Sequence, residues 1–161
     1  MLWLQCQTGM VRAVVQRVKR ARVLVEGVAV GSIAQGLLVL VAASPDDTEK
    51  DARVLAEKIA GLRIFGDEND HMNRSVIDVS GEVMVVSQFT LYGDVARGRR
   101  PSFTGAAAPE QAQPLIELFA SSLEERSLPV ARGSFGAKME VELVNQGPVT
   151  ILIETRGGRF V

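Results

Sequence analysis

Apolar residues alternate with polar ones in the first third of the chain, with the two-residue period of β-strands. Residues 11–18, "VRAVVQRV", and residues 23–31, "VLVEGVAVG", are rich in valine. The second segment is interrupted by Glu26-Gly27, where glycine can adopt the positive φ of a tight turn. An apolar run at residues 36–44, "GLLVLVAAS", follows directly. The pattern predicts a β-hairpin and a third, buried strand.

Two later segments have helical periodicity. Capping residues and a proline at 44–47 precede the first, whose predicted apolar face comprises Ala52, Leu55, Ile59 and Leu62. In the second, Pro114 is expected near the first turn, where a proline is tolerated. Its predicted apolar face comprises Ala112, Leu115, Ile116, Phe119 and Leu123. Both helices should lay one face on a sheet.

The remaining segments complete an α+β pattern. Residues 66–75 are polar and predict a loop, whereas residues 82–93 are the most strand-like part of the chain. A long irregular connection at 93–109 is of a kind that is often functional. Two strands are expected near 139–145 and 149–155. The order βββαβαββ predicts a single α+β domain with a largely antiparallel, barrel-like sheet and two main helices.

Composition narrows the class of protein. The chain has 161 residues, 47% of them apolar, which suits one domain with one core that needs neither a metal nor a disulfide. A single cysteine, Cys6, fits a reducing compartment. The apolar run at 36–43 is much shorter than the roughly 20 residues of a membrane helix, and the start of the chain lacks a secretory signal. We therefore expect a cytoplasmic protein without a membrane partner.

Charge is unevenly distributed although the net charge is only −1. Residues 10–22 contain five basic residues and no acidic one, and Arg97, Arg99 and Arg100 form a second basic cluster. Such clusters are either solvated surface charges or contacts for an anionic partner.

Elimination removes most familiar catalytic arrangements. The one histidine, His71, lies in a polar segment without a nucleophile motif, and no glycine-rich phosphate loop is present. His71 and Cys6 are too few for a zinc site, so no metal or cofactor is expected. What remains are polar residues within apolar segments. They are Ser87, Gln88 and Thr90 in "VVSQFTL" and the residues around Gly147-Pro148 in "NQGPVT".

Strand geometry sorts these residues. A regular strand at 83–91 would place Ser87 and Phe89 on one face and Gln88 and Thr90 on the other. Pro148 has no backbone N–H and should interrupt a ladder, and Gly147 leaves room for a ligand or another backbone.

Four segments together resemble the D-aminoacyl-tRNA deacylase, or D-tyrosyl-tRNA deacylase, family: "MVRAVVQRV", "SQFTLYGD", "GRRPSF" and "FGAKMEVELVNQGPVT". The resemblance covers a domain at residues 10–161 and leaves an N-terminal extension at residues 1–9. It implies an α+β homodimer with active sites at the subunit interface, each completed by a Gly-cisPro dipeptide of the partner chain. It also implies hydrolysis of the ester that joins a D-amino acid, or glycine, to the terminal ribose of tRNA. In this family the dipeptide rejects L-amino acids sterically, and the 2′-hydroxyl of the substrate assists the reaction without a metal or cofactor.

The same resemblance assigns roles to residues of this chain. Thr90 matches a position once proposed as a nucleophile, but without an adjacent base we expect it to position the substrate. Arg17 matches an arginine that braces the dipeptide, which here is Gly147-Pro148. The remaining matches are the catalytic segment Ser87, Gln88, Phe89 and Thr90, the pocket residues Leu91, Phe135 and Met139, and the phosphate-contact candidates Arg97, Arg99 and Arg100.

Two other functions fit the same residues. A noncatalytic module could bind the end of aminoacyl-tRNA without cleaving it, and a related deacylase removes L-alanine from mischarged tRNA. The chain departs from the family pattern at residues 1–9, which precede the usual start, and at Gly93, where the family has alanine.

Overall fold

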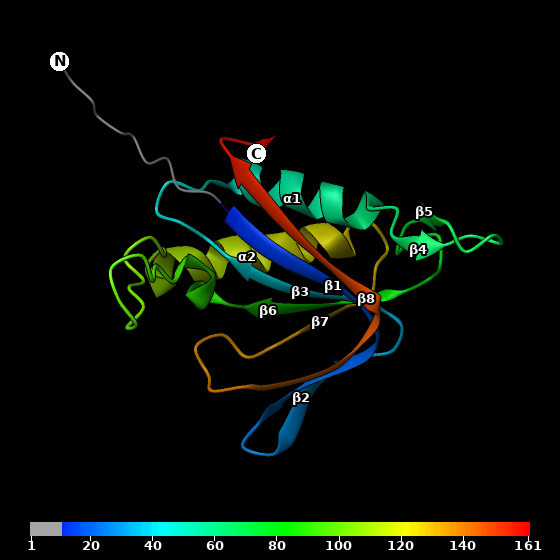
Figure 1. The fold of residues 1–161 in the computed structure, drawn as a ribbon, viewed down its shortest axis with the longest axis horizontal. Coiled ribbons are helices and arrows are strands. Elements are labelled where there is room, and N and C mark those ends of the chain that lie inside the picture. The colour runs from blue at the N-terminus through cyan, green and yellow to red at the C-terminus, as the bar shows by residue number, and fades with distance from the viewer. Residues whose placement is uncertain (1–10) are drawn as a thin grey trace.

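The computed structural model describes residues 11–161. The N-terminal extension expected at residues 1–9, and Cys6 within it, lie outside the described residues. Figure 1 shows the arrangement of the elements. In chain order they are β1 (Val11–Val25), β2 (Val28–Ile33), β3 (Gly36–Ala42), α1 (Glu49–Gly61), β4 (Phe65–Gly66), β5 (Met72–Arg74), β6 (Glu82–Ser87), the short 3-10 helix η1 (Phe89–Tyr92), α2 (Pro109–Glu124), β7 (Val130–Arg132), β8 (Glu140–Arg156) and β9 (Arg159–Phe160).

One curled sheet organises the domain. Its strand order is β7-β6-β3-β1-β8-β9, with β2 paired to β1. The pairs β3–β6 and β6–β7 are parallel and the others are antiparallel. The sheet is therefore mixed: most of its pairs are antiparallel, as expected, but two are parallel, which the sequence pattern did not predict. The parallel pairs arise because α1 and α2 provide the long crossovers that parallel strands require. Figure 1 shows both helices on one side of the sheet, which curls into a half-barrel.

The predicted β1–β2 hairpin is confirmed, but β1 is longer than expected. Val25 pairs with Val28 around a turn in which Glu26 and Gly27 have φ values of 49° and 78°. The segments expected at 11–18 and 23–31 belong to this hairpin, with β1 running unbroken for 15 residues. The basic residues between them do not end the strand, because β1 stays paired with β8 through this region.

Several boundaries differ from the sequence prediction. Thr48 caps α1 in a capping box with Asp51, so the cap lies just after the predicted 44–47 segment. Pro109, and not Pro114, occupies the first turn of α2, and Pro114 lies inside the helix. The expected loop at 66–75 contains the small β4–β5 pair. Both helices thus begin at signals that are themselves local, a capping box at Thr48 and a proline in the first turn at Pro109.

The core has two parts on opposite faces of the sheet. Leu37, Val39 and Val41 of β3 pack against the buried faces of α1 and α2. Leu38 points to the other side and packs with Met84, within the curl of the sheet. Successive residues of the strand thus belong to the two clusters in turn, as the two-residue period predicts.

A buried carboxylate lies before α1. The side chain of Asp47 is 7% exposed, and its Oδ2 accepts a hydrogen bond from the Ser44 hydroxyl at 2.9 Å. Its Oδ1 has no hydrogen-bond partner within the described residues. Burial raises the pKa of Asp47 above its ordinary value, more strongly than the hydrogen bonds from Ser44 lower it.

The raised pKa of Asp47 predicts pH-dependent stability. The folded state holds this proton more tightly than the unfolded state, so the free energy of unfolding falls as pH rises from about 4 through the folded-state pKa. In an Asp47→Asn variant this decline should be absent, so the difference in Tm between variant and wild type grows with pH. The control is Asp78→Asn, because hydrogen bonds from Ser75 lower the pKa of Asp78 and the sign reverses. Parallel Tm–pH curves for wild type and Asp47→Asn would contradict the assignment.

Candidate functional site

A cavity of about 550 Å³ opens at the carboxyl ends of β3 and β6, next to the start of α2. Ligands of sheets with parallel strands commonly bind at this edge. Five residues singled out from the sequence line this cavity: Ser87, Gln88, Phe89, Phe135 and Met139. The structure thus brings together residues separated by about fifty positions in the chain. Thr90 and Leu91 follow in the chain but are not part of the lining.

The strand β6 ends at Ser87, and the chain turns into η1. The Gln88 N–H donates to Val41 O at 2.9 Å, and the Leu91 N–H donates to Gln88 O at 3.1 Å. The expected strand at 82–93 is therefore wrong beyond Ser87, and so is the sorting of Gln88 and Thr90 to one strand face. Instead the Gln88 side-chain amide donates to the Thr90 hydroxyl.

A distant arginine and a buried tyrosine fix this turn. Arg12 Nη1 donates to Leu91 O at 3.0 Å, and the Arg12 guanidinium lies 4.9 Å from the centroid of the Tyr92 ring. Tyr92 is only 8% exposed, and burial raises its pKa. Because Arg12 and Tyr92 hold the end of η1, the polar residues before them have a defined position.

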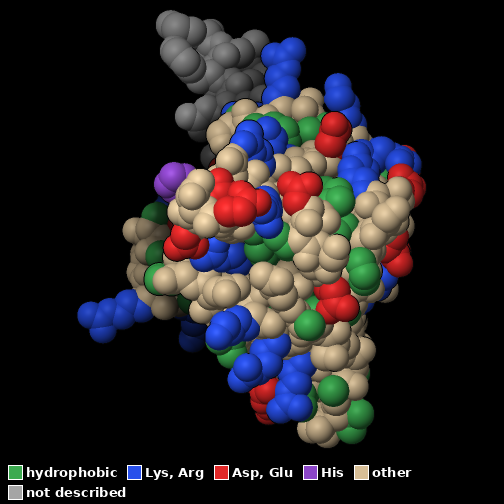
Figure 2. All heavy atoms as spheres, turned by 90° about the vertical axis from the view of Figure 1, so that its right-hand side faces the viewer, with side chains coloured by type: hydrophobic (Ala, Val, Ile, Leu, Met, Phe, Trp, Pro, Cys, Tyr) green, Lys and Arg blue, Asp and Glu red, His purple; other side chains and the backbone are tan. Residues whose placement is uncertain are grey.

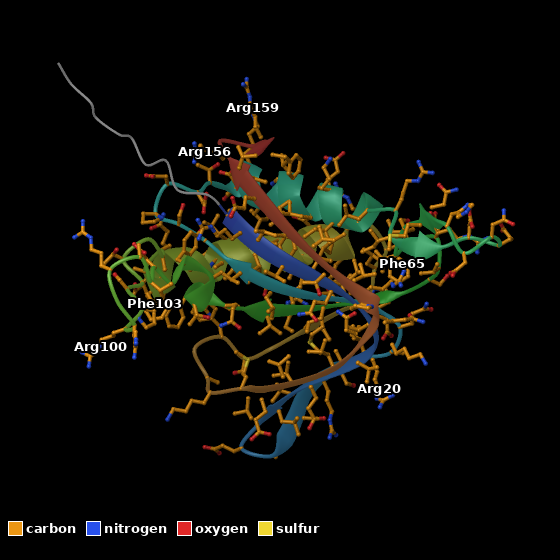
Figure 3. All side chains as sticks on the ribbon, viewed as in Figure 1. Arg20, Phe65, Arg100, Phe103, Arg156 and Arg159 are labelled. Atoms are coloured by element: carbon orange, nitrogen blue, oxygen red, sulfur yellow. The ribbon has the colours of Figure 1, made fainter. Side chains whose placement is uncertain are left out.

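The cavity contains an aromatic pair, of which the sequence prediction named Phe89 but gave Phe103 no role. Phe89 is 56% exposed and meets Phe103 edge to face, with ring centroids 5.2 Å apart. Phe103, labelled in Figure 3, comes from the connection between η1 and α2. The available signal was an aromatic residue within an otherwise polar connection. Exposed rings at a cavity suit a flat aromatic ligand.

The two backbone amides at the start of η1 are free for a ligand. Neither Phe89 N–H nor Thr90 N–H donates a hydrogen bond within the described residues. Unpaired amides in a first helical turn can stabilise a developing negative charge on a ligand oxygen. The start of η1 therefore offers two hydrogen-bond donors next to the cavity that Phe89 lines.

The second predicted motif interrupts the pairing of β8 with β1. Val18 pairs with Asn145 and Gln16 pairs with Thr150, so residues 146–149 bulge out of the ladder. This confirms that the ladder breaks at Pro148. Gly147 and Pro148 are exposed, and the peptide bond between them is cis.

Side chains on both sides hold the bulge in place. Arg17 Nε donates to Gln146 O at 2.8 Å, and Arg17 Nη1 donates to Ile64 O at 2.6 Å. The Asn145 side chain closes the bulge, accepting from Val149 N–H at 2.8 Å and donating to Val149 O at 3.0 Å. The structure thus brings Arg17 against the Gly147-Pro148 segment.

The cavity and the bulge lie apart within one chain. Arg17 pairs with Leu37 at the amino end of β3, whereas the cavity is bordered by Ala42 at its carboxyl end. At 3.3 Å per residue these positions are about 17 Å apart along the strand. Figure 1 likewise shows the bend of β8 at the opposite end of the sheet from η1. One chain therefore does not unite the two motifs.

Three arginines belong to the connection that also carries Phe103. Arg97, Arg99 and Arg100 are exposed in the connection after η1, and none of them forms an ion pair within the described residues. Figure 3 shows Arg100 and Phe103 at the same end of the molecule. On the face shown in Figure 2, by contrast, basic and acidic side chains are interspersed. The three arginines are thus available to an anionic ligand.

Two kinds of feature are absent from the described part of the chain. Residues 11–161 contain no group of three or more His, Cys, Asp and Glu side chains placed to hold a metal ion. None of the helices in this range has the length and hydrophobicity of a membrane span. His71, between β4 and β5, is exposed and does not line the cavity.

Comparison with known proteins connects this chain to one family. The family model described as D-Tyr-tRNA(Tyr) deacylase matches residues 14–154. The D-aminoacyl-tRNA deacylase of Heliobacterium modesticaldum is 60% identical over 147 residues, which cover 91% of this chain and 98% of the relative. The enzyme of the same description from Desulfatibacillum aliphaticivorans is 57% identical over 145 residues, covering 90% and 99%.

Solved structures show the same fold. A protein described as c-Myc DNA Unwinding Element Binding Protein superimposes with a TM-score of 0.84 at 41% identity, covering 91% of this chain and 99% of that one. A probable eukaryotic D-amino acid tRNA deacylase gives a TM-score of 0.75 at 19% identity, covering 91% and 100%. The second likeness concerns the fold alone.

Proposed function

This chain belongs to the D-Tyr-tRNA(Tyr) deacylase family, whose members hydrolyse D-aminoacyl-tRNA, and from this premise we propose that its cavity binds the aminoacylated 3′ end of tRNA. The observation that carries the proposal is the convergence of Ser87, Gln88, Phe89, Phe135 and Met139 on one cavity. The aromatic rings receive the terminal adenine, since stacking on an aromatic side chain contributes about 1–3 kcal/mol per base. Cleavage of the ester releases the D-amino acid, or glycine. We propose that the protein acts in the cytoplasm.

Catalysis in this proposal depends on position and not on a protein base. Thr90 is exposed, and the one hydrogen bond of its side chain within the described residues comes from Gln88. We assign it a positioning role, together with Leu91. The 2′-hydroxyl of the terminal ribose assists the attack of a water molecule on the ester carbonyl, and the ribose oxygen of the ester leaves. The amides of Phe89 and Thr90 stabilise the oxyanion that forms in between. The chain's own groups therefore orient the ester.

Chiral selection requires a second copy of the chain. We propose a homodimer in which Gly147 and Pro148 of one copy border the cavity of the other. The bulge supports this because it is exposed, braced by Arg17 and Asn145, and remote from the cavity of its own chain. Backbone atoms in that place would clash with any L side chain, whereas glycine has none to reject.

The three exposed arginines predict salt-dependent binding. A protein that neutralises phosphates loses affinity as salt rises, with a slope of about −0.7 to −0.9 per phosphate in a log–log plot. In an Arg97→Gln, Arg99→Gln, Arg100→Gln triple variant, we expect the slope of log KM for D-Tyr-tRNA against log salt to become shallower by about 2. D-tyrosyl-adenosine, which lacks the tRNA phosphates, provides the control, and its cleavage should not change. An unaltered slope would show that these arginines do not contact tRNA phosphates and are only solvated surface charges.

Parallel deacylation assays test the proposed function. Purified protein is incubated with D-Tyr-tRNA and L-Tyr-tRNA in the presence of EDTA, and the remaining ester is measured over time. We expect rapid loss of the D-ester only. Cleavage of L-Ala-tRNA alone would instead indicate the related L-alanine deacylase, and binding without cleavage would indicate a tRNA-end binding module.

A further inference from the structure

A second cavity adjoins the first. It has a volume of about 460 Å³ and lies between α2 and the carboxyl ends of β6 and β7. Ser87, Ile116 and Phe135 line both cavities. A ligand that fills the first cavity can therefore continue into the second without leaving the surface of the protein.

The second cavity differs from the first in its charged lining. Arg132 of β7 donates from Nε and Nη2 to the two carboxylate oxygens of Glu117 on α2, at 3.0 and 2.8 Å. Both residues line the cavity. Glu124 also accepts a hydrogen bond from this guanidinium but is not part of the lining. Nη1 of Arg132 donates no hydrogen bond within residues 11–161, so its N–H groups are available to a ligand.

We propose that this cavity receives the base of the nucleotide before the terminal adenosine, a cytidine in every tRNA. The inference rests on the proposed function. Cytosine carries an amino group that can donate to the Glu117 carboxylate, next to N3 and O2, which accept from the Arg132 guanidinium. Uracil has a carbonyl in place of the amino group, and this would face the Glu117 carboxylate. The pair therefore selects cytosine over uracil.

The charge of the second cavity makes it unsuitable for the phosphates or the amino acid of the substrate. Glu110 and Glu117 line it together with the single cation Arg132, so its net negative charge repels phosphate. A fixed carboxylate–guanidinium pair would also bind a few kinds of amino acid side chain better than the rest, so this cavity does not suit the variable amino acid of the substrate. An invariant nucleotide, by contrast, suits an invariant set of hydrogen-bond partners.

Three small esters separate this inference from the proposed function. We would compare kcat/KM of the full chain for the D-tyrosyl esters of adenosine, CpA and UpA, in which the amino acid is attached to the terminal adenosine. The CpA ester should be cleaved about tenfold more efficiently than the UpA ester, because a good bidentate contact to a base discriminates against the wrong base by at least about this factor. If the adenosine ester is cleaved but CpA and UpA react equally, the inference is overturned and the proposed function stands. If none is cleaved, both fail.

A matched pair of variants tests Glu117 itself. Glu117→Gln and Glu124→Gln each remove one carboxylate from Arg132, but only Glu117 lines the cavity. Because a glutamine amide can either accept from cytosine through its oxygen or donate to uracil through its nitrogen, Glu117→Gln should weaken the CpA preference while cleavage of the adenosine ester stays the same. Arg132 keeps part of the preference, since N3 accepts from it in cytosine but is itself a donor in uracil. Glu124→Gln should keep the preference. Equal effects of the two variants on the preference would show that Glu117 only supports the fold, and would overturn the assignment.

Discussion

A Gly147→Ala variant is expected to lose at least about a hundredfold in kcat/KM for D-Tyr-tRNA, because small displacements of substrate-positioning groups have effects of this size. Gly147 has a φ of +151°, and a Cβ added there would lie 2.8 Å from both the backbone nitrogen and a methyl group of Val149. The Val149 N–H donates to Asn145, so the clash displaces the bond that closes the bulge. The bulge would no longer fit the proposed partner cavity.

The loss should be one of activity and not of folding. Residues 146–149 lie outside the ladder, and Gly147 is exposed, so Tm should fall by only a few degrees. Gly157→Ala is the matched control, because Gly157 also has a positive φ, +58°, but a Cβ there would contact nothing within 4 Å. Full activity of Gly147→Ala would exclude the bulge from the site.

Gly36→Ala is expected to have the largest effect on stability. A Cβ at Gly36 would lie 1.8 Å from Glu82 O, where the backbones of β3 and β6 meet. No rotation of a side chain relieves this contact, so the two parallel strands must separate. Overpacking of a core costs about 1–3 kcal/mol, and we expect at least the upper value here, which lowers Tm by about 6–12 °C in a chain of this size.

Thermal denaturation of two glycine variants checks this expectation. A Cβ at Gly61, at the end of α1, would meet no atom within 4 Å, so Gly61→Ala should leave Tm unchanged or raise it slightly. Because β6 leads directly to Ser87, the Gly36→Ala variant should also lose ester cleavage. A Tm equal to that of Gly61→Ala would show that β3 and β6 do not approach so closely in solution.

Local patterns predicted the elements that depend on neighbouring residues. The hairpin at Glu26-Gly27 was predicted because a turn is determined by its own few residues. The helix faces were predicted because their period is local. The turn after Ser87 was not, since "SQFTLY" contains the strand formers Phe89, Thr90 and Tyr92, and the contact that holds the end of η1 comes from the distant Arg12.

Residues of the candidate site could be assigned a role from the sequence only where they match a functional position of the family. The resemblance pointed to Ser87, Phe135 and Gly147-Pro148, but Phe103 belongs to a connection without periodic pattern. The second cavity could not be predicted either, because Arg132 and Glu117 face each other only after α2 packs beside β7. Composite features of this kind depend on tertiary packing, which a single sequence does not display.

The strand β1 fixes the distance between the two arginines that hold η1 and the bulge in β8. Arg12 holds the end of η1, and Arg17 holds the bulge in β8. Both positions belong to one regular ladder with β3, and because their separation is odd, the two side chains leave the strand on opposite faces. Inserting or deleting one residue between them would turn one arginine to the wrong face. The length of this segment is thus part of the architecture of the site, and evolution can exchange its residues far more readily than it can change their number.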